Sequence, residues 1–83
     1  MPNLSQSRKV VAVVARRLKQ ERVCRGLSMT RLAKQAGLSQ QMVSYIERGM
    51  RNPTLDTLLR IAAVLDVDLW RVIKTAWNQN RKL

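Results

Sequence analysis

Two short segments, each preceded by a serine and followed by a glycine, lie one after the other between Ser28 and Gly49. Ser28 stands where an N-cap would begin the segment MTRLAKQA, and Gly37 stands where that helix would end. Ser39 stands in the same place before the segment QQMVSYIER, which Gly49 ends. The spacing predicts two consecutive helices that are joined by only a few residues.

The small and apolar residues of this unit stand where two crossing helices need them. Ala33 is small at the point where the second helix would cross closely, and Gly37 supplies the positive φ of a tight turn. Val43 and Ile46 would anchor the second helix of the pair to a core. The remaining apolar positions are Leu32, Ala36 and Leu38. This pattern predicts a helix-turn-helix over about residues 28–48.

The rest of the chain indicates further helices, because alternation of period two, which would indicate strands, is nowhere sustained. A first helix is expected over about residues 5–25, with Ser5 or Ser7 as its N-cap and Gly26 as a left-handed cap at its end. At this length one domain over residues 1–83 is expected. The predicted fold class is all-α, a compact bundle of five helices.

Two more helices follow the helix-turn-helix unit. Pro53 blocks continuation of the preceding helix, and Thr54 caps a fourth helix. Asp68 caps a fifth helix, expected over about residues 68–80, and Asp66 and Asp68 are interpreted as capping residues rather than as a catalytic or metal-binding pair. The core candidates of the fourth helix are Leu55, Leu58, Leu59, Ala62 and Leu65.

The charge of the chain points to an anionic partner. Sixteen Lys and Arg residues against five Asp and Glu residues give a formal net charge of +11, which attracts nucleic acid or an anionic membrane. The longest apolar run, VVAVVA, is far shorter than the roughly 20 residues that span a bilayer, and no signal peptide is recognised. A cytoplasmic protein without a membrane segment is expected.

Catalytic and metal-binding chemistry lacks its usual residues. The chain has one cysteine and no histidine, which excludes disulfides, the usual zinc sites and Cys/His or Ser/His catalysis within one chain. The five acidic residues show no recognised acid-base or metal-site spacing. The sequence therefore predicts a protein that is not an enzyme and has no cofactor or metal.

From RLKQER through GLSMTRLAKQAGLSQQMVSYIERGMRNPTLDTLLRIAAVLDVDL, the chain resembles the lambda-repressor-like family, also called the Cro/CI or XRE type. The resemblance covers roughly residues 14–72. It implies a five-helix domain that inserts its third helix into the major groove of double-stranded DNA, usually as a homodimer on a pseudo-palindromic operator. The positions that match the base-contacting face of the family are Gln40, Gln41, Ser44 and Tyr45.

Further roles follow from the same resemblance. Phosphate contacts are expected from residues at the ends of the third helix and in the loop after it, namely Ser39, Arg48, Arg51 and Asn52. Arg22 and Glu47 match a pair that in some relatives forms a buried ion pair, which implies a role in fixing the recognition helix. At Met29 many relatives have a glutamine that braces the first recognition glutamine, so Gln41 and Tyr45 are expected to determine specificity before Gln40.

The fifth helix carries two tryptophans beyond what the minimal domain of the family needs. Trp70, Ile73 and Trp77 share one face and are candidates for a dimer interface, because aromatic residues are enriched at such surfaces. The alternative is that they pack within the monomer, and both can hold if one tryptophan is inside and the other lies between subunits.

These observations favour a sequence-specific transcriptional regulator of prokaryotic, phage or plasmid origin, most simply a repressor or autoregulator. A restriction-modification controller protein and an antitoxin that also binds DNA remain alternatives, although the short tail NQNRKL offers little room for a toxin-binding segment. A third alternative is nonspecific nucleic-acid binding that the net charge alone would drive. The operator, the regulated genes and any small-molecule effector stay open.

Overall fold

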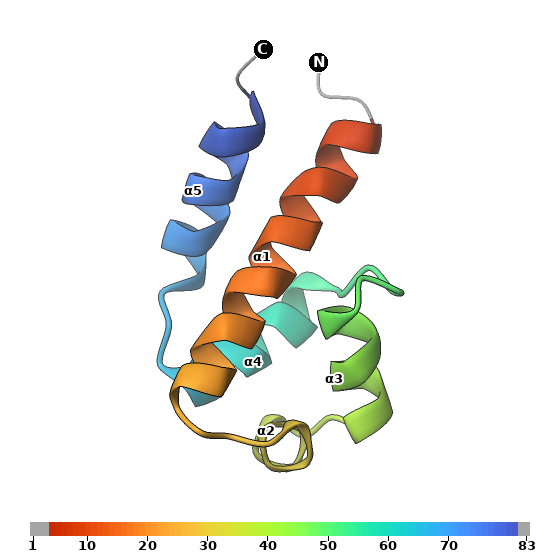
Figure 1. Cartoon of the computed structure of the whole chain (residues 1–83), viewed down its shortest axis with the longest axis vertical. Helices are drawn as coiled ribbons and strands as arrows, with labels where there is room; N and C mark the ends of the chain where they lie inside the picture. Colours follow the sequence, from red (N-terminus) through yellow and green to blue (C-terminus); the bar gives the residue numbers. More distant parts are fainter. Residues whose placement is uncertain (1–3, 82–83) are drawn as a thin grey trace.

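Five α-helices make up the part of the chain that the computed structural model describes, residues 4–81, and no strand occurs there. They are α1 (Leu4–Cys24), α2 (Met29–Ala36), α3 (Gln40–Glu47), α4 (Leu55–Leu65) and α5 (Leu69–Arg81) (Figure 1). This confirms the predicted all-α fold with a helix-turn-helix at α2 and α3. No helix in the described range is both long and apolar enough to cross a bilayer.

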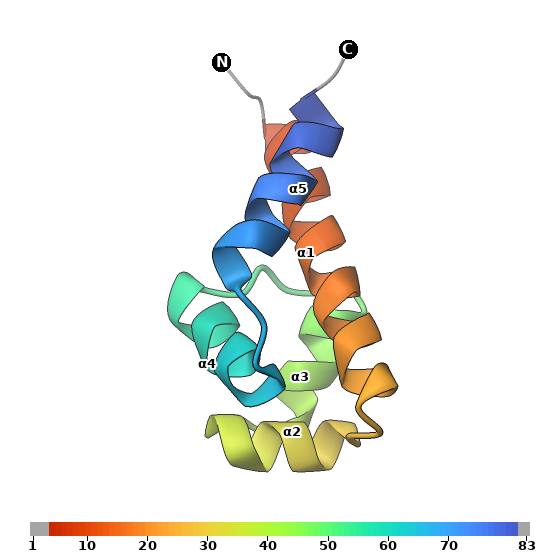
Figure 2. The same cartoon turned by 90° about the vertical axis from the view of Figure 1, so that its left-hand side faces the viewer.

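The long helices α1 and α5 lie side by side and antiparallel, and the three shorter helices gather at the end of α1 that leads into α2 (Figures 1 and 2). The amide nitrogen Nε2 of Gln6 donates a 2.9 Å hydrogen bond to the backbone oxygen of Asn80, so α1 and α5 are tied near both ends of the chain. α2 crosses the far end of the bundle beneath α3 and α4 (Figure 2). This leaves α3 at one side of the molecule.

Hydroxyl side chains begin the three short helices as the sequence predicts. The Oγ atoms of Ser28 and Ser39 each accept a hydrogen bond of 3.0 Å from the backbone N–H three residues later, and Oγ1 of Thr54 accepts one of 3.1 Å. Each of these residues has extended backbone angles, as an N-cap requires. The caps satisfy backbone donors that would otherwise lack partners.

Left-handed residues end the helices. Gly37 has φ of 71°, and the N–H of Leu38 donates to the carbonyl of Ala33 at 2.8 Å, which closes α2 in a Schellman motif. At the end of α4 the left-handed position is held by Asp66, with φ of 55°, where the short polar side chain tolerates this conformation. Asp68 precedes α5, and its backbone oxygen accepts from the N–H groups of Arg71 and Val72.

The start of α1 differs from the prediction. The helix begins at Leu4, so Ser5 and Ser7 lie inside it and neither is its N-cap. The hydrogen bond from Gln6 to Asn80 shows that this first turn is in contact with α5. The end of α1 at Cys24, before the left-handed Gly26, agrees with the prediction.

The core runs the length of the molecule between the helices. Val43, Leu65 and Ala76 have no exposed surface, and Leu32 exposes 1%. Two core candidates of α4 were wrong, because Leu55 and Leu59 are 62% and 51% exposed. The buried stripe of α4 instead consists of Leu58, Ile61, Ala62 and Leu65.

Leu65→Ala is expected to lower the free energy of unfolding by about 2–5 kcal/mol, because it leaves a cavity at a fully buried position. Leu59→Ala is the matched control on the same helix and is expected to change it by no more than about 0.5 kcal/mol, since half of that side chain is in water. Urea denaturation followed by circular dichroism measures both. Equal losses in the two variants would contradict the assignment of the α4 core stripe.

Candidate functional site

One face of α3 is in the core and the opposite face is open. Val43 and Ile46 are buried, at 0% and 2% exposed, and they hold the helix against the bundle. Gln40 and Gln41 are exposed, whereas Ser44 and Tyr45 are partly buried. The four residues predicted to contact bases are therefore all outside the core, on a helix that begins at the Ser39 cap.

The outward face of α3 carries a small network centred on Tyr45. Nε2 of Gln41 donates a 2.7 Å hydrogen bond to the hydroxyl oxygen of Tyr45, one turn further along the helix. Within the described residues, Gln40 has no side-chain hydrogen bond. The two neighbouring glutamines thus differ in how firmly they are held. Met29 does not lie on this face with them but packs against the core.

Two arginines from the end of α3 and the loop after it lie over the ring of Tyr45. The guanidinium carbon of Arg51 is 5.4 Å from the ring centroid, and that of Arg48 is 6.0 Å away. Nη2 of Arg48 also donates to the Sδ atom of Met50 at 2.7 Å. Cation–π contact holds positive charge beside the tyrosine while leaving guanidinium N–H groups free to donate.

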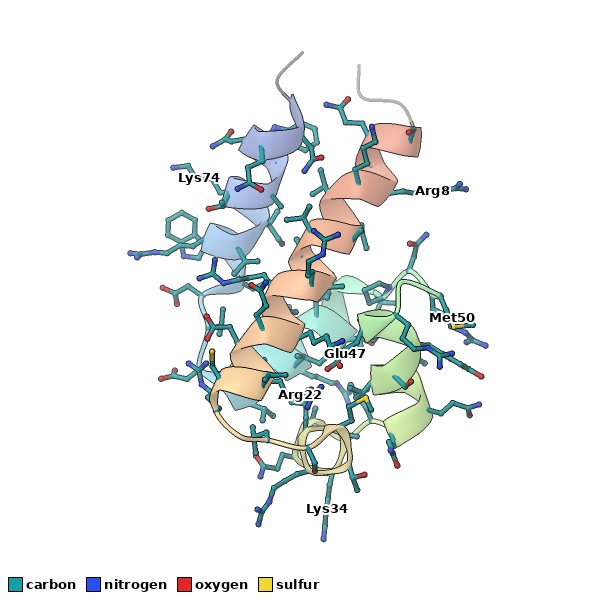
Figure 3. The ribbon with its side chains drawn as sticks, viewed as in Figure 1. Arg8, Arg22, Lys34, Glu47, Met50 and Lys74 are labelled. Atoms are coloured by element: carbon teal, nitrogen blue, oxygen red, sulfur yellow. The ribbon has the colours of Figure 1, made fainter. Side chains whose placement is uncertain are left out.

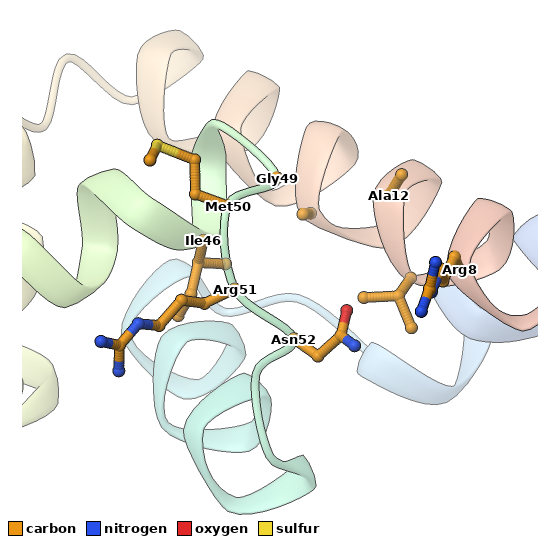
Figure 4. A pocket seen from close by; sticks show the side chains of 9 residues that line it. Arg8, Ala12, Ile46, Gly49, Met50, Arg51 and Asn52 are labelled. Atoms are coloured by element: carbon orange, nitrogen blue, oxygen red, sulfur yellow. The ribbon is translucent and has the colours of Figure 1, made fainter.

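The other two residues predicted to bind phosphate are also exposed. The hydroxyl of Ser39 accepts the N-cap bond from Met42, so its own O–H remains able to donate to a ligand. Asn52 lies in the loop, where its side chain points toward α1 (Figure 4). Ser39 and Asn52 therefore mark the two ends of α3, and the structure does not bring them together.

Arg22 of α1 and Glu47 of α3 point toward each other (Figure 3) and form a two-pronged ion pair. Nε of Arg22 lies 2.7 Å from Oε2 of Glu47, and Nη2 lies 2.9 Å from Oε1. The side chains are only 11% and 7% exposed. Nη1 of Arg22 donates a third bond, of 2.7 Å, to the backbone oxygen of Leu27, so one guanidinium joins α1, the turn before α2 and the last residue of α3.

A cleft of about 420 Å³ lies between the loop after α3 and the first half of α1 (Figure 4). Its walls include Ala12 and Ala15 from α1 and Ile46 from α3, and Arg8 and Asn52 supply polar groups. Arg8 could not be predicted from the sequence, because the cleft joins residues that are far apart in the chain and no local pattern indicates it.

Carboxylates are already engaged elsewhere. Four of the five acids form ion pairs with arginines, and the fifth, Asp66, ends α4. The hydrogen bond from Arg25 lowers the pKa of the Glu21 carboxyl, which therefore stays ionised. No group of three or more potential metal ligands occurs within residues 4–81. The excess of positive charge on the surface is thus not balanced locally.

The three residues of the candidate dimer surface have different environments. Trp77 and Ile73 pack against the core as partly buried side chains, whereas Trp70 is 60% exposed. The indole of Trp70 is covered in part by Arg71 and Lys74, whose charged groups lie 5.4 and 5.9 Å from the ring. One tryptophan is therefore inside the monomer and the other faces outward.

Glu47→Ala is expected to lower the free energy of unfolding by about 3–5 kcal/mol, because it leaves the Arg22 guanidinium poorly solvated and without a carboxylate partner. The matched control is Asp56→Ala, which breaks an exposed pair with Arg60 and is expected to cost at most about 1 kcal/mol. Chemical denaturation measures both. If the two losses were equal, the pair of Arg22 and Glu47 would contribute no more than a surface pair.

Comparison with known proteins places this arrangement among helix-turn-helix proteins. A family model described as helix-turn-helix matches residues 18–69. The HTH-type transcriptional regulator SinR of Bacillus subtilis (strain 168) is 38% identical over 58 residues, which are 69% of this chain and 52% of SinR. The uncharacterized HTH-type transcriptional regulator y4dJ of Sinorhizobium fredii is 42% identical over 60 residues, which are 72% of this chain and 74% of that protein.

Two further comparisons agree. The HTH-type transcriptional regulator SutR of Escherichia coli (strain K12) is 48% identical over 50 residues, which are 60% of this chain and 28% of SutR. The crystal structure of SinR, the master regulator for biofilm formation, in complex with DNA aligns with a TM-score of 0.67 and 36% identity, covering 72% of this chain and 97% of that one. In the sequence comparison, this chain spans about half the length of SinR.

Proposed function

This chain belongs to the lambda-repressor-like helix-turn-helix family, and on that premise we propose that it is a sequence-specific DNA-binding regulator of transcription. The observation that carries the proposal is the outward face of α3, where Gln40, Gln41, Ser44 and Tyr45 stand outside the core on a helix that is anchored from behind. The related proteins SinR and SutR are HTH-type transcriptional regulators, and SinR has been crystallised with DNA. In the proposed complex α3 enters the major groove of double-stranded DNA.

The chemistry of Gln41 suits recognition of adenine. Its amide uses one N–H for the bond to Tyr45, which leaves a second N–H and the carbonyl oxygen. Adenine presents one acceptor and one donor in the major groove, and a glutamine amide can pair with both. Because Tyr45 orients the side chain before binding, we propose that Gln41 and Tyr45 contribute more to sequence preference than Gln40.

The charged groups around α3 suit the DNA backbone. We assign phosphate contacts to Ser39 at the beginning of the helix and to Arg48, Arg51 and Asn52 at its end and in the loop. The backbone of DNA runs along both sides of the major groove, so groups at the two ends of a recognition helix meet different strands. These contacts would position the protein without choosing the sequence.

We further propose that the protein acts as a homodimer on a pseudo-palindromic operator, as a repressor or autoregulator. A single half-site offers few base contacts, and the exposed indole of Trp70 is the kind of aromatic surface that interfaces bury. The dimer surface would be centred on the outward side of α5, with Trp77 and Ile73 serving the monomer core.

Gln41→Ala is expected to relax the base preference at one position in each half-site, because its amide can no longer pair with the base edge. Discrimination at that position is expected to fall by about 1–3 kcal/mol while the other positions keep theirs. Selection of bound DNA from a random pool, performed with the wild type and the variant, measures the preference at every position and also reports half-site spacing and symmetry.

The matched control for that selection is Gln20→Ala, which removes an exposed glutamine amide from α1 and should leave the selected sequences unchanged. A loss of affinity in Gln41→Ala that is uniform over all sequences would contradict base recognition by this residue. A wild-type pool without any enriched sequence would contradict the proposed function itself and favour nonspecific binding.

Trp70→Ala is expected to weaken self-association, because it removes the exposed indole from the proposed interface. Sedimentation equilibrium at micromolar concentration, performed with and without DNA, should show dimers of the wild type in at least one of the two conditions. The variant should show a larger share of monomer under the same condition. The unfolding free energy of the variant should stay within about 0.5 kcal/mol of the wild type, because the side chain is exposed. A wild-type protein that is strictly monomeric on and off DNA would exclude the dimer.

A further inference from the structure

The cleft that Asn52 faces is one end of a longer groove beside α1. A second cleft, of about 400 Å³, continues along α1 toward Lys19, and the two share Ala12, Ala15 and Gly49 as walls. We call the continuous groove between α1 and the segment from Arg48 to Asn52 the basic cleft. Its shared walls carry no side chain larger than a methyl group, so an elongated ligand can approach the backbone there.

The basic cleft is lined by positive charge from two directions. Helix α1 contributes Arg8, Arg16 and Lys19, and the end of α3 with its loop contributes Arg48 and Arg51. Among the described residues that line the cleft, Glu47 is the only carboxylate, and Arg22 holds both of its oxygens. Among the described residues 4–81, no ion pair joins any of the five cationic side chains to an acid.

Unpaired cations also occur outside the basic cleft among the described residues, at Lys9, Arg31, Lys34 and Lys74, but the cleft brings five of them to one groove. Elsewhere on the molecule, the arginines at positions 17, 25, 60 and 71 each have a carboxylate within 4 Å. Like charges that face one another across a groove raise the local potential, because each loses some of the screening that bulk water provides. An anionic ligand that entered the basic cleft would meet these unpaired cations and the amide of Asn52 together.

The basic cleft lies directly beside the carboxyl end of α3. Arg51 lines the cleft and at the same time stacks on Tyr45 of the outward face of α3. Arg8 and Met50 lie on the same side of the molecule, and Lys74 lies on the opposite side (Figure 3). If α3 enters the major groove, the strand that borders that groove passes the end of α3 and therefore the mouth of the cleft.

We propose that the basic cleft is a phosphate-binding site for the DNA backbone beyond the groove that α3 occupies, and that Arg8 and Arg16 of α1 are its contacts from outside the residues that the family model matches. The proposal rests on the proposed DNA binding. The match to the family model begins at residue 18, so both arginines precede the residues that the model matches. The site adds affinity that does not depend on sequence and widens the stretch of DNA that one protomer covers.

The decisive experiment compares Arg8→Gln with Lys9→Gln. Both remove one positive charge from the same turn of α1 and both positions are exposed, but Lys9 does not line the cleft. Binding to a 30-base-pair duplex of fixed arbitrary sequence is measured at several salt concentrations. Each lost phosphate contact lowers the slope of log affinity against log salt by about 0.9.

Arg8→Gln is expected to reduce that slope by about 0.9. The affinity at 50 mM salt divided by the affinity at 200 mM salt would then be about threefold smaller than in the wild type. Lys9→Gln is expected to leave the slope near that of the wild type. Arg16→Gln should behave as Arg8→Gln does. Equal effects of Arg8→Gln and Lys9→Gln would overturn the proposal, because a general field of charge would then account for both. Unchanged slopes in all variants would overturn it as well.

A second arm distinguishes DNA from a free phosphorylated ligand. Calorimetric titration of the wild type with pyrophosphate and with ATP is expected to give no saturable binding below millimolar concentration. The DNA assignment would be overturned if the wild type bound pyrophosphate or ATP at micromolar concentration, if Arg8→Gln abolished that binding, and if the salt slopes for DNA were unchanged. The cleft would then be a site for a small phosphorylated ligand. Because the duplex has an arbitrary sequence, this experiment can succeed or fail independently of the selection that tests sequence recognition by α3.

Discussion

The orientation of α3 depends on the ion pair between Arg22 and Glu47. The guanidinium holds both carboxylate oxygens at 2.7 and 2.9 Å and also binds the backbone oxygen of Leu27, so three segments meet at one side chain. Removing two charges from water costs more than a loose pair returns, and only this full set of bonds makes such a burial tolerable. Glu47 is the last residue of α3, and the pair therefore adds a polar anchor beside the buried Ile46 at that end of the helix.

Because the anchoring groups lie behind α3, its outward face is free to vary in sequence without loss of the fold. Gln41 and Tyr45 hold each other, and Arg48 and Arg51 cover the tyrosine ring. None of these contacts involves the core. The acidic side chains lie elsewhere, and four of the five form ion pairs with arginines that are not on this face. Rigidity and charge thus come from separate sets of residues, and the face combines a fixed position with a positive potential.

Local chemistry made much of this structure predictable. Ser28 and Gly37 bound α2 at the predicted residues because caps act within one helical turn. Leu55 and Leu59 were misassigned because both are leucines near a buried stripe. The centre of that stripe lies near Leu58 and Leu65, and Leu55 and Leu59 are rotated from it by about a fifth and about a third of a helical turn. The stacking of Arg51 on Tyr45 could not be predicted because it depends on the path of the loop after α3. The cleft that holds Arg8 could not be predicted because it depends on how distant segments meet in space.

The hydrogen bond from Gln6 to Asn80 joins residues separated by 74 positions, so it closes nearly the whole chain into a loop. The turns between the other helices close within a few residues and cost far less chain entropy. During folding, α2, α3 and α4 can therefore assemble first from local contacts, and the pairing of α1 with α5 completes the molecule last. The ends of α1 and α5 that lie outside the matched residues 18–69 would then be the first part to separate, which makes them a latch that opens while the Arg22 end of α1 still holds α3.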